Sequence, residues 1–134
     1  MVRRPKTSDQ TEHYVKEQVK KILGRTEWKF WMPAAGVFGL NGVSDFLCIK
    51  QPKLFMAIET KYDDVVTAQQ FKFLTTVHDA GHYAFLVDET NVSELPKLLA
   101  NLENDASIPQ SFLKWQTQNP IMDMRILKTL TSNL

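Results

Sequence analysis

Apolar and polar residues alternate along two adjacent runs near the middle of the chain. The first run covers residues 44–50, the second covers residues 54–61, and Gln51, Pro52 and Lys53 lie between them. Alternation of this kind predicts β-strands, and a short connection of this kind is typical of the turn in an antiparallel hairpin. With Pro52 at the centre of the turn, odd-numbered residues of both strands share one face and even-numbered residues share the other. Both faces are largely apolar, so we expect helices to cover the sheet on both sides.

Helical and strand patterns flank this hairpin. Apolar residues recur at helical spacing over residues 8–23, where Ser8 can act as the N-cap, and again over residues 67–79. Residues 27–32 alternate and predict a strand, and the apolar residues 82–87 predict a buried strand. Because a helix precedes it, this last strand is expected to run parallel to the second hairpin strand. The pattern predicts an α/β fold with an αβββαβ core, in which helices flank a mixed central sheet.

A helical extension is predicted after this core, over residues 91–134. Three helical segments are expected there, beginning at Ser93, at Ser111 and at Asn119. The extension carries large apolar residues, including Phe112 and Trp115, which form either a dimer or partner surface or a part of the core.

Two acidic residues occupy matching positions in the predicted hairpin. In the register that Pro52 sets, Asp45 faces Glu59 with Cβ atoms roughly 5 Å apart, and Lys61 lies on the same side two residues further on. Like charges opposite one another destabilise a sheet, and a divalent cation between them would remove that penalty. The sequence therefore predicts a metal site at this end of the hairpin. The alternative is that Glu59 and Lys61 form an ordinary exposed pair at a strand end.

Four short motifs around these residues resemble a nuclease family. In chain order they are Gly42-Val43-Ser44-Asp45, Ile58-Glu59-Thr60-Lys61, Thr67-Ala68-Gln69-Gln70 and Ala80-Gly81-His82-Tyr83-Ala84. Together they resemble the VRR-NUC (virus-type replication–repair nuclease) family of the PD-(D/E)XK nuclease superfamily, over a core of roughly residues 8–90. One position departs from the superfamily's name, because Ser44 precedes Asp45 where the name has a proline. The resemblance implies a restriction-endonuclease-like fold and metal-dependent hydrolysis of DNA phosphodiester bonds.

The resemblance also implies a catalytic centre. Asp45 and Glu59 would bind Mg²⁺ or Mn²⁺, and the backbone carbonyl of Thr60 is available as a third ligand. The cation would stabilise charge on the scissile phosphate and lower the pKa of a bound water. Lys61 would position that water or help to deprotonate it.

Two further residues match the family's motifs and also have a structural explanation. Gln70 matches a catalytic motif position, but Thr67 and Gln70 also fit a capping box at the start of a helix. Glu12 matches an acidic position that makes an outer-shell metal contact, but it also fits a solvated acid in the first turn of a helix.

Composition sets the class of protein. The chain has 134 residues, which suits one domain with a single core. It contains one cysteine, Cys48, which excludes an internal disulfide and is expected in the core. No run of about 20 apolar residues is present, and residues 1–6 do not resemble a signal peptide. We therefore expect an intracellular protein, in its own cell or, if virus-encoded, in a host cell, with no membrane partner.

Charge is unevenly distributed around a net value of +1. Residues 1–30 hold eight basic and four acidic residues, so this part of the chain is positive. Its basic residues can contact phosphates, or can simply be solvated. The candidate DNA-binding residues are Arg3, Arg4, Lys6, Lys20 and Lys21, with Gly39 and Asn41 in a glycine-containing loop before Asp45.

Taken with the resemblance, these features predict a Mg²⁺- or Mn²⁺-dependent DNA endonuclease. The resemblance implies a homodimer that acts on branched DNA such as four-way junctions, in replication, recombination or repair. The alternative is a non-catalytic nucleic-acid-binding or assembly module that retains the fold.

Overall fold

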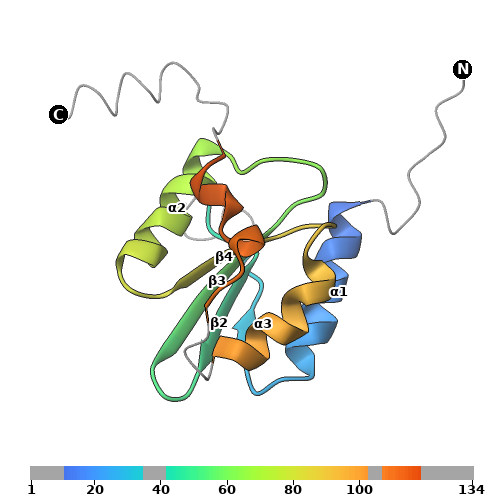
Figure 1. The fold of residues 1–134 in the computed structure, drawn as a ribbon, viewed down its shortest axis with the longest axis vertical. Coiled ribbons are helices and arrows are strands. Elements are labelled where there is room, and N and C mark those ends of the chain that lie inside the picture. The colour runs from blue at the N-terminus through green and yellow to red at the C-terminus, as the bar shows by residue number, and fades with distance from the viewer. Residues whose placement is uncertain (1–10, 35–41, 103–106, 119–134) are drawn as a thin grey trace, which may run out of the picture.

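The computed structural model describes residues 11–34, 42–102 and 107–118, and these residues form a mixed α/β fold (Figure 1). Its elements follow one another in the order that the sequence predicts for the core, helix, three strands, helix and strand. They are α1 (Glu12–Gly24), β1 (Lys29–Trp31), β2 (Phe46–Lys50), β3 (Leu54–Thr60), α2 (Ala68–Asp79), β4 (Tyr83–Val87) and α3 (Leu95–Asn101), with 3₁₀ turns η3 (Val92–Glu94), η5 (Gln110–Phe112) and η6 (Lys114–Gln116).

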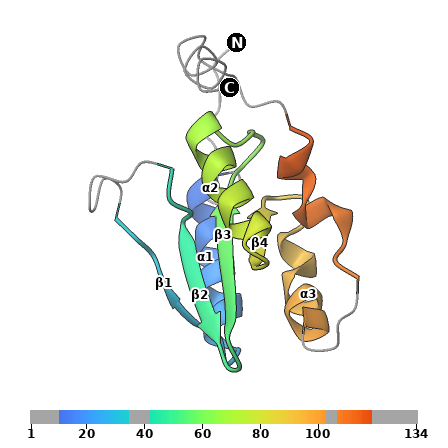
Figure 2. The ribbon, with the colours of Figure 1, turned by 90° about the vertical axis from the view of Figure 1, so that its left-hand side faces the viewer.

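The four strands of the described region form one mixed sheet in the order β1-β2-β3-β4, as Figure 2 shows from left to right. β1, β2 and β3 are successively antiparallel, and β4 runs parallel to β3. Phe46 pairs with Ile58 and Leu47 pairs with Ala57, which confirms the register predicted from Pro52. The parallel orientation of β4 is confirmed as well, since α2 supplies the crossover connection.

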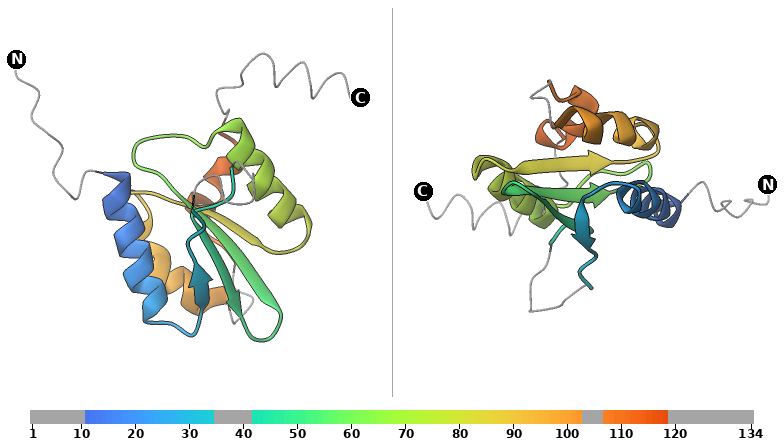
Figure 3. Two further views of the ribbon diagram at one scale, coloured as in Figure 1. Left: turned by 180° about the vertical axis from the view of Figure 1, so that it is seen from behind. Right: turned by 90° about the horizontal axis from the view of Figure 1, so that it is seen from below.

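Helices cover both faces of the sheet, as predicted (Figure 3). Even-numbered hairpin residues such as Phe46 and Ile58 belong to the core cluster that also contains buried residues of α1 and α3. The odd-numbered Ala57 belongs to a second cluster, with residues of α2 and with Trp115. Cys48 is fully buried in the first cluster, in agreement with its expected core position.

The first helix begins later than the sequence predicts. Thr11 is its N-cap, and the Thr11 side chain accepts a hydrogen bond of 3.2 Å from the backbone N–H of Tyr14. This interaction satisfies one of the unpaired amides of the first turn, so the helix starts at Glu12 and Ser8 is not its cap. Ser8 itself lies outside the described residues.

The C-terminal part differs from the prediction in its secondary structure, while its two large aromatic residues take one of the two predicted alternatives. Residues 111–117 do not form one helix but two 3₁₀ turns, η5 and η6. Phe112 and Trp115 are buried in the core and do not form an exposed partner surface. The Trp115 indole N–H donates to the carbonyl of Ala84 at 2.9 Å, so this ring covers the outer edge of β4. The last predicted helix, from Asn119, lies outside the described residues. In the part of the chain that the structure describes, no helix has the length and apolar character to cross a membrane.

Candidate metal centre

Asp45 directly precedes β2 and is fixed by the end of β3. Its Oδ2 accepts two hydrogen bonds from Thr60, one from the backbone N–H at 2.9 Å and one from the hydroxyl at 2.6 Å. Thr60 is fully buried as the last residue of β3, so it is a rigid anchor. The predicted register places Asp45 opposite Glu59, and the bonds to the neighbouring Thr60 set the direction of the Asp45 carboxylate.

Glu59 is a buried carboxylic acid near the end of a strand. Its side chain is only 1% exposed, and its Oε2 has no hydrogen-bond partner among the described residues. Burial, followed by the charges of Asp45 and Glu12, raises the pKa of Glu59 to about 9, while Lys61 and Lys16 act in the opposite direction. An unpartnered buried carboxyl oxygen is costly to the fold unless another group satisfies it.

Glu12 completes a cluster of three acids. It is the first residue of α1, which brings its carboxylate to the end of β3. Glu12, Asp45 and Glu59 each offer one oxygen, and these oxygens all lie within 4.8 Å of one another. The structure therefore brings together the three acidic residues that the sequence selects, and Glu12 belongs to the same group of oxygens as the other two. The alternative description of Glu59 as part of an exposed strand-end pair is wrong, because its side chain is buried.

Two lysines accompany the acids. Lys61 follows β3, is 7% exposed, and is held by its backbone N–H, which donates to the Val87 carbonyl of β4 at 3.0 Å. Lys16 lies one turn beyond Glu12 on α1, and its Nζ is 3.5 Å from Oδ1 of Asp45. From the sequence, Lys16 is only one of the basic residues that can contact phosphates, and its contact with Asp45 is not foreseen, although its spacing of four residues from Glu12 places both on one face of the helix.

Gln70 forms a capping box at the start of α2. The Thr67 backbone N–H donates to Gln70 Oε1 at 2.9 Å, and the Gln70 backbone N–H donates to the Thr67 hydroxyl at 3.2 Å. This confirms the structural explanation for the motif. The catalytic role of Gln70 stays a prediction.

Gly42 brings the segment before Asp45 against the start of α2. It has a positive φ of 81°, and a Cβ atom at this position would lie 2.7 Å from the backbone of Gln69. Only glycine fits such a close approach in this conformation without strain. The glycine in front of Asp45 therefore sets the path of the chain into the site.

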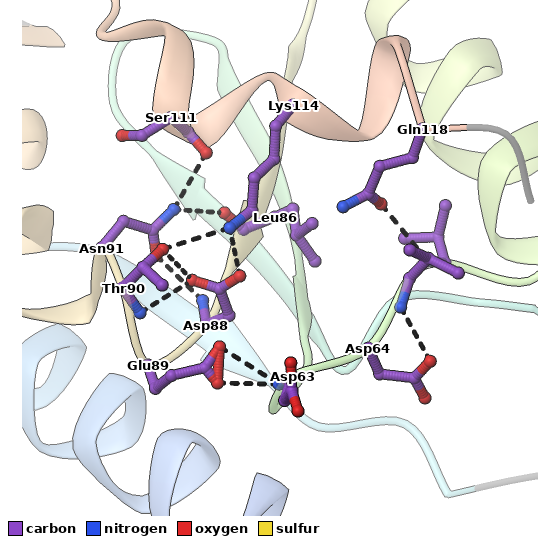
Figure 4. A network of polar contacts seen from close by, with 12 residues as sticks. Asp63, Asp64, Leu86, Asp88, Glu89, Thr90, Asn91, Ser111, Lys114 and Gln118 are labelled. Carbon is purple, nitrogen blue, oxygen red and sulfur yellow. Dashed lines mark hydrogen bonds and ion pairs between the residues drawn. The ribbon is translucent and has the colours of Figure 1, made fainter.

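A polar network braces the strand ends beside the site (Figure 4). The Asp88 backbone N–H donates to the side-chain oxygen of the buried Asn91 at 2.8 Å, and the Asp88 carboxylate pairs with Lys114. Burial would raise the pKa of Asp88, but hydrogen bonds from Lys114 and Thr90 outweigh it and lower the pKa. The Glu89 carboxylate accepts from the backbone N–H of Asp63 at 2.7 Å, which fixes the chain two residues after Lys61.

Some of the remaining predicted site residues lie within the described part of the chain and others lie outside it. Lys20 and Lys21 are exposed on α1, and Lys20 continues the helix face that carries Glu12 and Lys16. The Thr60 backbone carbonyl stays a predicted ligand, while the N–H and hydroxyl of the same residue orient Asp45. The other candidate DNA-binding residues lie outside the described residues; they are Arg3, Arg4, Lys6, Gly39 and Asn41.

Comparisons of this chain with models of protein families, with curated proteins and with solved structures find no significant match. The chemistry of the site therefore has to be inferred from its own geometry. Three clustered carboxylate oxygens, one of them from a buried residue with an unpartnered oxygen, form an acidic cluster that could hold a metal ion. Oxygen donors of this kind suit a hard cation such as Mg²⁺ or Mn²⁺.

Proposed function

We propose that this protein is a Mg²⁺- or Mn²⁺-dependent DNA endonuclease with a restriction-endonuclease-like core. The observation that carries the proposal is the convergence of Glu12, Asp45 and Glu59, with oxygens within 4.8 Å of one another, beside the buried Lys61. These groups come from three separate elements, α1, the start of β2 and the end of β3. A packing role alone gives no reason to gather three acids at one end of a sheet, where their mutual repulsion is a cost.

The residues of the cluster have distinct proposed tasks. Asp45, Glu59 and Glu12 would hold the cation, which would supply charge stabilisation at the phosphate and a lowered pKa for a bound water. Lys61 orients the attacking water and places a positive charge beside the phosphate as negative charge develops on it. Lys61 is suited to this task because its backbone is fixed to β4 and its side chain is largely removed from solvent.

The surroundings of the cluster support an anionic substrate. Lys16 and Lys20 follow Glu12 along one face of α1, so a phosphate backbone that reaches the acids would also pass these two ammonium groups. We propose branched DNA such as a four-way junction as the preferred substrate. We further propose that two copies of the chain act together, because one small domain covers few phosphates.

Cleavage of defined DNA substrates tests this proposal. Four-way, flap, nicked and single-stranded DNAs are incubated with the protein and Mg²⁺ or Mn²⁺, and the same reactions are repeated with EDTA. We expect metal-dependent cleavage, with the four-way substrate cut fastest, and a loss of at least a hundredfold in Asp45→Asn and Lys61→Ala.

The control for Asp45→Asn is a variant that removes one carboxylate far from the acid cluster. Asp79 is exposed at the far end of α2, and Asp79→Asn should cut at the wild-type rate. Cleavage that persists in Asp45→Asn would show that the nuclease activity comes from another site or another protein. DNA binding without cleavage under every metal condition would instead support the non-catalytic module.

A further inference from the structure

Lys16 places a positive charge beside the acid cluster formed by Glu12, Asp45 and Glu59. It lies four residues after Glu12 on α1, and its ammonium group is 3.5 Å from Oδ1 of Asp45. Asp45 contributes one of the three oxygens of the acid cluster, so the ammonium group of Lys16 lies directly beside that cluster.

The ion pair between Lys16 and Asp45 is loose. A distance of 3.5 Å is longer than the 2.7–2.9 Å that is typical of a charge-assisted hydrogen bond, and the two side chains are 33% and 21% exposed. Partly exposed pairs of this kind contribute little to stability, so Lys16 can leave Asp45 at small cost. Asp45 would stay in place when this happens, because Thr60 holds its other oxygen through two shorter hydrogen bonds.

We propose that Lys16 is an internal counter-ion that competes with the divalent cation for the acid cluster. In the metal-free protein its ammonium group offsets part of the repulsion between the carboxylates of Asp45 and the neighbouring Glu12. When a divalent cation binds, Lys16 is repelled from Asp45 and becomes available to a phosphate of the substrate. Lys16 is therefore a positioning residue that couples metal binding to DNA binding, and this inference rests on the proposed metal site.

Metal affinity, measured without DNA, tests the inference. Mn²⁺ is titrated into wild-type protein and into Lys16→Gln, with free Mn²⁺ followed by electron paramagnetic resonance and heat followed by calorimetry. Removal of the competing charge should tighten Mn²⁺ binding by roughly three- to tenfold, and the gain should shrink as salt is added. Lys16→Arg keeps the charge and should bind Mn²⁺ as the wild type does.

A second variant controls for the change in net charge. Lys29 is exposed on β1 and pairs with Ile49, four residues along β2 from Asp45 and roughly 13 Å away. Lys29→Gln should leave Mn²⁺ affinity within about twofold of the wild type at 0.15 M salt. Thermal melting in EDTA checks that each variant is folded, and Lys16→Met replaces Lys16→Gln if the latter is not.

The outcomes separate this inference from the proposed function. Unchanged or weaker Mn²⁺ binding in Lys16→Gln, with normal binding by the wild type, would overturn the role of Lys16 and leave the metal site standing. An equal gain in Lys29→Gln would show a general charge effect and would also overturn it. If the wild-type protein binds no Mn²⁺, both the metal site and the role of Lys16 are wrong.

Discussion

The hydroxyl of Thr60 donates a hydrogen bond of 2.6 Å to the carboxylate of Asp45 and so ties the start of β2 to the end of β3. Since Asp45 carries one of the clustered oxygens, this bond aims a proposed metal ligand. Hydrogen bonds to charged groups contribute more than neutral ones, about 1.5–3 kcal/mol each.

Thr60→Val tests this orienting role. Valine has the shape of threonine and keeps the backbone N–H, but it lacks the hydroxyl donor. We expect a loss of about 1–2 kcal/mol in the free energy of unfolding and roughly tenfold weaker Mn²⁺ binding. Urea denaturation and Mn²⁺ titration measure the two effects, and Thr60→Ser, which keeps the hydroxyl, should be closer to the wild type in both. Wild-type metal affinity in Thr60→Val would show that the hydroxyl does not orient Asp45.

The raised pKa of Glu59 predicts a pH-dependent stability. Burial and the charges of Asp45 and Glu12 raise this pKa from 4.5 to about 9, so between these values the unfolded chain is ionised at Glu59 while the folded protein holds a proton there. The contribution of the protonated Glu59 to the free energy of unfolding is fully present below pH 4.5. It is lost as the pH rises towards 9, by at most about 1.4 kcal/mol per pH unit.

Glu59→Gln removes this titration while keeping the shape of the side chain. In EDTA, the melting temperature of Glu59→Gln should exceed that of the wild type by an amount that grows from pH 5 to pH 9. Added Mn²⁺ should reverse the order at pH 8, because it stabilises only a protein that binds it. A difference that does not change with pH in EDTA would mean that Glu59 is ionised in the folded protein at neutral pH.

Gly42 is predicted to tolerate no side chain. Its φ is 81°, and a Cβ atom would lie 2.7 Å from the backbone of Gln69. Gly42→Ala should lower the free energy of unfolding by about 1–3 kcal/mol and weaken metal binding, since the segment leads into Asp45.

Gly24 offers a matched position for the same substitution. It is the last residue of α1, and apart from its chain neighbours and the backbone of its own helix no described atom lies within 4 Å of where a Cβ would stand. Gly24→Ala should be neutral or stabilising by up to about 1 kcal/mol, because alanine favours the helix. Denaturant unfolding of the two variants side by side measures the contrast, and equal effects would contradict the close contact at Gly42.

Much of the fold follows from local signals in the sequence. The alternation on both sides of Pro52 set the hairpin register, and the helix before β4 set its parallel direction. The start of α1 was misplaced because several polar residues near the N-terminus can cap a helix, and the choice of Thr11 depends on which amide its side chain reaches. The sequence leaves two alternatives open for Phe112 and Trp115, because burial against the edge of β4 is a long-range contact with no local signature.

The site was predictable only in part. Asp45 and Glu59 could be paired from register, whereas Glu12 was a candidate only through the family resemblance, with a solvated acid in the first helical turn as the alternative. The contacts of Lys16 and Thr60 could not be found in this way. The Lys16 contact depends on how α1 packs against the end of the sheet. The Thr60 contact depends on the direction of the Asp45 side chain, which lies just before β2 and is not set by strand pairing.

Paramagnetic broadening of amide NMR signals by Mn²⁺ shows whether Glu12, Asp45 and Glu59 bind a divalent cation. We expect substoichiometric Mn²⁺ to remove the signals of Glu12, Asp45 and Thr60 first, and EDTA to restore them. Signals of the hairpin turn next to Leu54 should persist, because the length of β3 places them roughly 20 Å from the site. Broadening centred on other acids such as Asp79 or Glu94, or none at all, would show that these three acids do not form a metal site.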